Sequence, residues 1–236
     1  MQHDSRYKDV IRELERLSDP AAVLGMARYG ISSQNTLGIS MPTLRRLAKD
    51  VGKDSCLARE LWDSGIHEAR ILAALICRPR DVTIEQMEAW GRDFDSWDVC
   101  DQVCGNLFDK TPFAYEKALE WSARDEIFVK RAGFALMAWT AVHDRRLGDE
   151  YFLSYLAVIV RESDDDRNFV KKAVNWALRQ IGKRNRFLNG EAVAARGRSR
   201  RRRRRAANGS RPMLCVSWRA TRYSEDYGGS SWREFM

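Results

Sequence analysis

The sequence predicts an all-α protein in which helix pairs stack into a right-handed solenoid with a concave face. The first observation is helical periodicity through residues 1–190, where no alternating apolar and polar run is long enough to indicate a sheet. The second is an internal repeat: FVKRAGFALMAW begins at Phe128, and FVKKAVNWALRQ begins at Phe169, 41 residues later. Helix pairs that repeat in this way must stack on their neighbours to bury their apolar faces.

The spacing of this repeat lies within the ~40–47-residue period of HEAT and armadillo helix pairs. A weaker echo, EARILAALI, begins at Glu68. The periodicity predicts helices over Tyr7–Leu17, Ala21–Tyr29, Met41–Val51, Lys53–Trp62, Glu68–Ile76, Ile84–Gly91, Trp97–Phe108, Phe113–Trp121, Glu126–Val142, Asp149–Arg161 and Arg167–Lys183.

Short capping and breaking signals separate these helices. Asp19-Pro20 precedes the second helix, Pro42 lies in the first turn of the third, and Thr83 precedes the sixth. Thr111-Pro112 divides the seventh from the eighth, and the acidic run Asp164–Asp166 comes before the last.

The net charge of +8 is unevenly distributed along the 236 residues. Of the 41 basic and 33 acidic residues, residues 191–236 hold 12 Arg, no Lys and four acids, so residues 1–190 hold 29 of each sign. A helical body with no net charge can bind nucleic acid only through a local basic face.

Other features of the sequence point to a cytoplasmic protein of the bacterial cytosol, expected to be a monomer. No run of 18 apolar residues predicts a membrane span, and MQHDSRYKDV lacks the apolar core of a secretory signal. The five cysteines are dispersed, which favours reduced structural thiols. With three histidines and no paired ligand motif, neither a metal nor another cofactor is expected.

Two helices carry polar residues at the edges of their apolar faces. Trp97 and Asp101 are i and i+4 on one helix, so the carboxylate lies beside an indole where the helix leaves the core. The last helix carries a basic stripe with one embedded indole, formed by Lys172, Trp176, Arg179 and Lys183. The repeat places Arg131 at the position of Lys172. Tryptophans at such spacing are usually core and basic stripes usually solvated, so the pattern suggests a site without naming a reaction.

Six motifs occur in order: MARY (Met26–Tyr29), GIS-P-RR (within Gly38–Arg46), RELWD (Arg59–Asp63), SWD-x-x-D (Ser96–Asp101), KRA (Lys130–Ala132) and KA-x-x-W-x-LR (Lys172–Arg179). Together they resemble the HEAT-repeat alkylpurine DNA glycosylases of the AlkD type, over about residues 5–190. The resemblance implies a metal-free enzyme that excises N3- and N7-alkylated purines from double-stranded DNA. It implies a catalytic carboxylate at Asp101, active-site indoles at Trp97 and Trp176, a DNA-contacting Arg131 and an aromatic contact at Tyr29.

This chemistry suits a sparse site. A cationic alkylpurine leaves without protonation, so a carboxylate that stabilises the oxocarbenium-like sugar and orients water is sufficient. Arg131, Lys172, Arg179 and Lys183 would hold backbone phosphates. The alternative is a non-catalytic solenoid that binds DNA or a protein.

The C-terminal part departs from this pattern. After Asn189 the helical period is expected to give way to ARGRSRRRRRRAANGSRPM, which contains six consecutive arginines at Arg200–Arg205. The sequence therefore divides into a helical-repeat domain, 1–190, and an Arg-rich segment, 191–236. That segment is either a disordered basic tail or an out-of-frame end, and either would leave the last repeat uncovered.

Overall fold

The computed structural model describes residues 2–207, and within them every regular element is helical. The α-helices are α1 (Gln2–Arg16), α2 (Pro20–Ala27), α3 (Met41–Val51), α4 (Ser55–Asp63), α5 (His67–Ile76), α6 (Ile84–Arg92), α7 (Trp97–Asn106), α8 (Ala114–Ser122), α9 (Ile127–His143), α10 (Asp149–Arg161), α11 (Asn168–Gly182) and α12 (Arg186–Ala207). Two short 3₁₀ helices, η1 (Pro79–Asp81) and η2 (Phe108–Lys110), follow α5 and α7. The predicted all-α fold class is confirmed.

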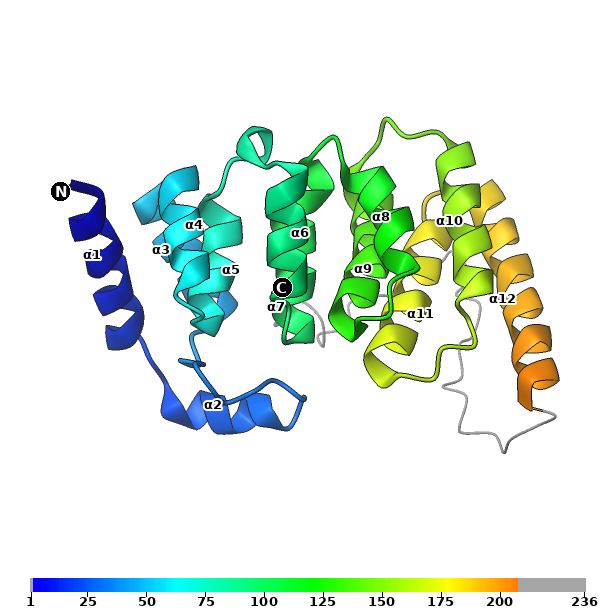
Figure 1. Ribbon diagram of the computed structural model, residues 1–236. Coiled ribbons are helices and arrows are strands. Elements are labelled where there is room, and N and C mark those ends of the chain that lie inside the picture. Colours follow the sequence, from blue (N-terminus) through cyan, green and yellow to red (C-terminus); the bar gives the residue numbers. More distant parts are fainter. Residues whose placement is uncertain (1, 208–236) are drawn as a thin grey trace.

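The helices stack from one end of the molecule to the other in two rows (Figure 1). We call α3, α5, α7, α9 and α11 the inner row, in which each helix packs against the next. The outer row consists of α1, α4, α6, α8 and α10, and α4 and α8 pack directly on α5 and α9. Successive pairs therefore bury one another, as expected for a solenoid.

A series of aromatic rings runs along the interior of the outer row. Trp62 of α4 stacks on Trp90 of α6 with ring centroids 4.1 Å apart, and Trp90 contacts Phe108, which contacts Trp121 of α8. Two of the indole N–H groups are satisfied, because Trp62 donates to Asp93 and Trp121 to Glu88. Offset aromatic contacts of this kind hold neighbouring repeats in register.

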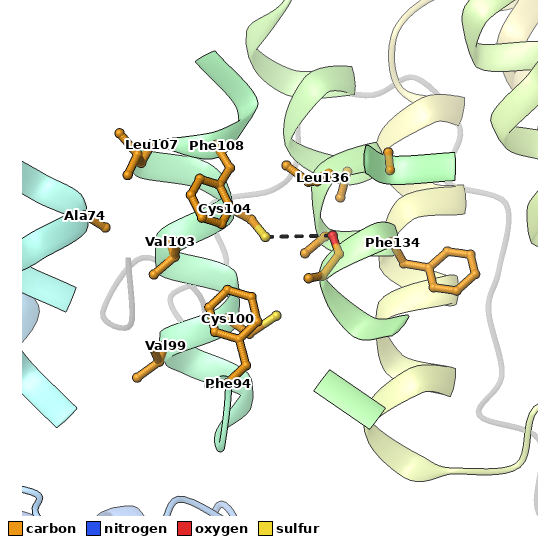
Figure 2. Close-up of a cluster of buried hydrophobic side chains, with 14 of the residues drawn as sticks. Ala74, Phe94, Val99, Cys100, Val103, Cys104, Leu107, Phe108, Phe134 and Leu136 are labelled. Carbon is orange, nitrogen blue, oxygen red and sulfur yellow. Dashed lines mark hydrogen bonds between the residues drawn. The ribbon is translucent and has the colours of Figure 1, made fainter. Parts of the chain in front are cut away.

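The apolar arc predicted for α7 is buried between two neighbours. Figure 2 shows Val99 and Val103 on the side of α7 that faces α5, whereas Cys100 and Cys104 point toward α9. All four side chains are fully buried. Both cysteines are free thiols, as are Cys56 and Cys77, whereas Cys215 lies outside the described residues.

α2 leaves the two rows and lies below the neighbouring helices, roughly perpendicular to them (Figure 1). Asp19 caps it by accepting from the N–H groups of Ala21 and Ala22. The loop after α2 is anchored to α5, because the buried carboxylate of Glu68 accepts three backbone N–H groups, those of Leu37, Gly38 and Ile39. Gly38 has a φ of 79°, and a Cβ there would lie 2.3 Å from the Asp19 carbonyl oxygen, so only glycine fits.

The expectation that the helical period ends after Asn189 is wrong. α12 continues to Ala207 and packs against α10 and α11. Leu188, Ala192 and Ala195 recur at i, i+4 and i+7 and are buried, so one face of α12 covers the last repeat.

The division of the chain at residue 190 stays an expectation. The nature of residues 208–236 lies outside the described residues. Among residues 2–207, no helix is long and apolar enough to cross a membrane.

Candidate functional site

Asp101 and Arg131 form a bidentate ion pair between the inner helices α7 and α9. Arg131 Nε donates to Asp101 Oδ1 at 2.9 Å, and Nη2 donates to Oδ2 at 2.7 Å. The third guanidinium nitrogen, Nη1, donates to the carbonyl oxygen of Phe169 in α11 at 2.7 Å. A single arginine thus joins three neighbouring helices at the carboxylate.

The pair is nearly buried, since the side chains of Arg131 and Asp101 are 6% and 14% exposed. Burial raises the pKa of Asp101 above its ordinary value, although the charge and hydrogen bonds of Arg131 oppose that increase. The pKa of Arg131 is raised, because Asp101 outweighs the opposing effect of burial. The two N–H donors aimed at the two oxygens favour the ionised carboxylate. Each oxygen keeps a further lone pair that can face a ligand.

Trp97 lies beside this pair, as the spacing on α7 predicts. The Arg131 guanidinium carbon is 5.7 Å from the centroid of the Trp97 ring, within the range of a cation–π contact. Trp97 Nε1 donates to the carbonyl oxygen of Tyr29 at 3.0 Å, so the segment that follows α2 reaches α7. The Tyr29 side chain is 59% exposed. Gly30, with a φ of 77°, lets this segment turn against the ring of Phe169.

A third indole, Trp139 of α9, belongs to the site and was not predicted. Its Nε1 donates to the backbone carbonyl of Asp101 at 3.0 Å, and its ring meets Trp176 of α11 edge-on with centroids 5.4 Å apart. A Cβ at Gly105 would lie 2.3 Å from Trp139 Cε2, so glycine is required for this approach. Gly105, one turn after Asp101, is the feature of the sequence that could have indicated this close contact.

The basic stripe of α11 lies on the next inner helix. Lys172 and Lys183 are exposed, whereas Arg179 and Trp176 are half-buried. Trp139 links Trp176 to Asp101, and no hydrogen bond or ion pair joins the three cations to the Asp101–Arg131 pair. The structure therefore brings Trp97, Asp101, Arg131 and the Tyr29 backbone together. It places Lys172, Arg179 and Lys183 on the adjoining helix.

Asp98, the other carboxylate of this stretch, has a different partner. Its Oδ2 lies 2.8 Å from Nε2 of the buried His67 in α5, and its Oδ1 accepts from Ser96 Oγ. Burial raises the pKa of Asp98, but the hydrogen bond and charge of His67 outweigh it and lower that pKa. Burial lowers the pKa of His67, and Asp98 reverses this effect and raises it. Asp98 thus ties α5 to α7.

The described side chains contain no group of three His, Cys, Asp or Glu residues placed to hold a metal ion. The chemistry available at this site is that of a buried carboxylate, an arginine and three indoles.

A solved structure shares this architecture, with a TM-score of 0.74 and 19% identity over 82% of this chain and 83% of that chain. It is described as a member of "a new family of proteins related to the HEAT-like repeat DNA glycosylases with affinity for branched DNA structures". At this identity the likeness concerns the fold alone. No curated protein sequence matches the chain significantly. The family model of the DNA alkylation repair enzymes matches residues 10–209, which include every helix of the site. Because this match covers most of its length, the chain belongs to the DNA alkylation repair enzyme family.

Proposed function

We propose that the protein is a DNA glycosylase that hydrolyses the N-glycosidic bond of cationic N3- or N7-alkylated purines in duplex DNA. The observation that supports this most is the Asp101 carboxylate, which Arg131 holds in a bidentate and mostly buried ion pair beside Trp97. A carboxylate in such surroundings interacts with a developing positive charge more strongly than it would in water.

The reaction needs little more than this charge. As the bond between C1′ and the purine nitrogen breaks, its electron pair stays on the base and neutralises the base's positive charge. The sugar becomes an oxocarbenium-like cation, which Asp101 stabilises electrostatically. Water then adds to C1′ and loses its proton, which the Asp101 carboxylate can accept.

The other residues have supporting roles in this proposal. Arg131 fixes both oxygens of Asp101, so we assign it the positioning of the carboxylate in place of the phosphate contact expected from the sequence. Trp97 and Trp176 provide aromatic faces that attract a cationic base or sugar. Lys172, Arg179 and Lys183 hold backbone phosphates of the duplex, and Tyr29 presents an exposed ring at the rim.

The decisive experiment is release of 7-methylguanine from methylated duplex DNA by the purified full-length protein, followed by chromatography of the free base. Wild-type protein should release the base in a time-dependent manner, and Asp101→Asn should release it far more slowly. Absence of release by a folded wild-type protein that binds the duplex would refute the proposed activity.

One observation favours a second function, a DNA-binding solenoid without turnover. The bidentate pair leaves Asp101 with its charge already neutralised by Arg131, as a structural ion pair would. The related structure is also described by an affinity for branched DNA. Under this alternative the protein binds a four-way junction more tightly than a linear duplex of equal length. Asp101→Asn would then alter folding stability without affecting any base release.

A further inference from the structure

A groove opens between the inner helices α3 and α5. The inner helix α7 separates α5 from α9, which carries Arg131. Its volume is about 460 Å³, and it is lined by Arg45, Ala48, Lys49, Gly52, Lys53 and Leu75. The floor is apolar and three of the six lining residues are cations. All three of these residues are exposed.

The cations of this groove lack acidic partners. No ion pair joins Arg45 or Lys49 to a carboxylate in residues 5–202, the part of the chain whose side chains are described. Lys53 Nζ donates to the carbonyl oxygens of Leu75 and Cys77 at the end of α5. By contrast, cations of α1 such as Arg16 are neutralised within their own helix.

The positive charge also extends beyond the groove. Burial lowers the pKa of Lys53, and the nearby positive charge of Lys110, which follows α7, lowers it further. Lys110 Nζ donates to backbone carbonyls at the end of α7, as Lys53 does at the end of α5. Repulsion between cations that lack carboxylates is relieved when an anion binds.

We propose that this groove binds backbone phosphates of duplex DNA, at a position separate from the Asp101 site. The inference deepens the proposed function, because it assigns a second anchor for the same duplex. Guanidinium and ammonium groups beside an apolar floor suit a phosphodiester, whose two free oxygens accept from Arg and Lys while the sugar contacts apolar atoms. An acidic peptide is the competing occupant.

Helix spacing gives this second anchor a measurable consequence. Neighbouring packed helices lie ~8–10 Å apart, so the groove and the α11 stripe are separated by roughly 30 Å. At ~3.4 Å per base pair this corresponds to about nine base pairs of duplex. A long duplex reaches both anchors at once, whereas a duplex of about six base pairs occupies only one of them.

The test compares Arg45→Gln/Lys49→Gln with a control that removes the same charge from the outer row, Arg12→Gln/Arg59→Gln. The measurement is the Kd for an undamaged duplex of ~24 base pairs by fluorescence anisotropy over a range of salt concentrations. The groove variant should bind roughly tenfold or more weakly at ~0.1 M salt, and its salt slope should fall by about two. The control should resemble wild type. On a duplex of about six base pairs the groove variant should lose no more than ~twofold, because the α11 stripe remains available.

Equal losses in the groove variant and the control would overturn the proposal, since net charge alone would then explain them. A second result would also overturn it. If the wild-type protein binds polyglutamate as tightly as DNA, and this binding also depends on Arg45 and Lys49, the groove binds acidic protein. These outcomes are separate from failure of the proposed glycosylase activity, because no base release is measured. Thermal unfolding of each variant verifies that it is folded.

Discussion

Asp98 and Asp101 lie on the same helix, one turn apart, yet their surroundings give them different capacities. Asp101 faces an indole and an arginine on the side of α9, so its charge can act on a ligand. We predict that Asp101→Asn lowers excision of 7-methylguanine by about 10²–10³-fold, the scale of losing one preorganised stabilising group. Affinity for undamaged duplex should stay nearly constant, because no DNA phosphate depends on this carboxylate. Single-turnover kinetics and anisotropy measure the two quantities.

Asp98→Asn is the matched control for that prediction. Asp98 is committed to His67 and Ser96, so its loss should lower folding stability while excision by the folded protein continues. An Asp98→Asn variant that melts normally but has lost activity would show that the wrong acid was assigned.

Gly105 is required for the close approach of Trp139 to α7. In Gly105→Ala the added methyl would overlap the Trp139 ring, and relief of this overlap must displace either the indole or α7. We expect a loss of about 1–3 kcal/mol of stability and a lower excision rate even where the variant is folded. Gly25→Ala is the control, because a Cβ there meets nothing within 4 Å and alanine favours the helix α2. Thermal melts and single-turnover rates distinguish the two variants, and equal behaviour would contradict a positioning role for Trp139.

These residues also show what the sequence can and cannot predict. Trp97 and Asp101 could be paired because an i, i+4 relation is fixed by the helix itself. The contacts of Arg131 with Asp101 and of Trp139 with Trp176 join separate helices, and no spacing rule fixes the rotation of one helix against the next. The internal repeat and the resemblance to a known family both singled out Arg131, whereas neither singled out Trp139 or His67.

The ion pair between His67 and Asp98 connects α5 to α7 and makes their packing pH-dependent. The pKa of His67 is raised on folding, so its contribution is present below its ordinary value of ~6.5 and is lost as pH rises through the raised value. The pKa of Asp98 is lowered, so its contribution is present above ~3.9 and is lost as pH falls through the lowered value. The pair therefore stabilises most between about pH 4 and 6.5.

A variant lacking the imidazole tests this dependence. The difference in unfolding free energy between wild type and His67→Gln should be larger at about pH 5.5 than at about pH 8.5. Urea unfolding at both values measures it. A difference that is constant or grows with pH would mean that His67 is neutral in the folded protein.

The basic stripe of α11 should supply phosphate contacts. Charge reversal in Arg179→Glu/Lys183→Glu should weaken duplex binding similarly for all sequences and reduce the salt slope by about one for each lost contact. Arg59→Glu on the outer helix α4 provides the control. If the α11 variant binds duplex with wild-type affinity and salt slope, the stripe is simply solvated.

α12 shows why one element escaped prediction from sequence. Its buried face consists of Leu188, Ala192 and Ala195, and two of these three are small. An apolar stripe made largely of alanine gives a weak periodic signal, and the arginines around it dominate the composition. Packing against α10 and α11 nevertheless buries that face. Tertiary contacts therefore stabilise this helix although its local sequence pattern is weak.

The site exists only because the repeats are stacked. α7, α9 and α11 each contribute a part of it, and α2 is drawn in from outside the rows to meet Trp97. In a solenoid, stability is approximately a sum of the stabilities of the repeats and of the contacts between neighbours. A change at one end should therefore loosen the nearest repeats first. The end nearest the site is the one covered by α12.

Leu188 and Phe187 test this directional coupling, because they are adjacent in α12 and differ in burial. Leu188 is fully buried, whereas Phe187 is 54% exposed. Leu188→Ala should cost about 2–5 kcal/mol locally, and Phe187→Ala should cost much less. Hydrogen exchange should show lost protection in α10 and α11 of the Leu188 variant, with α4 and α5 unchanged, and excision should fall as Trp176 loses its support. Uniform loss of protection in every helix would instead mean that the molecule unfolds as one cooperative unit, and that α12 stabilises the site no more than it stabilises any other repeat.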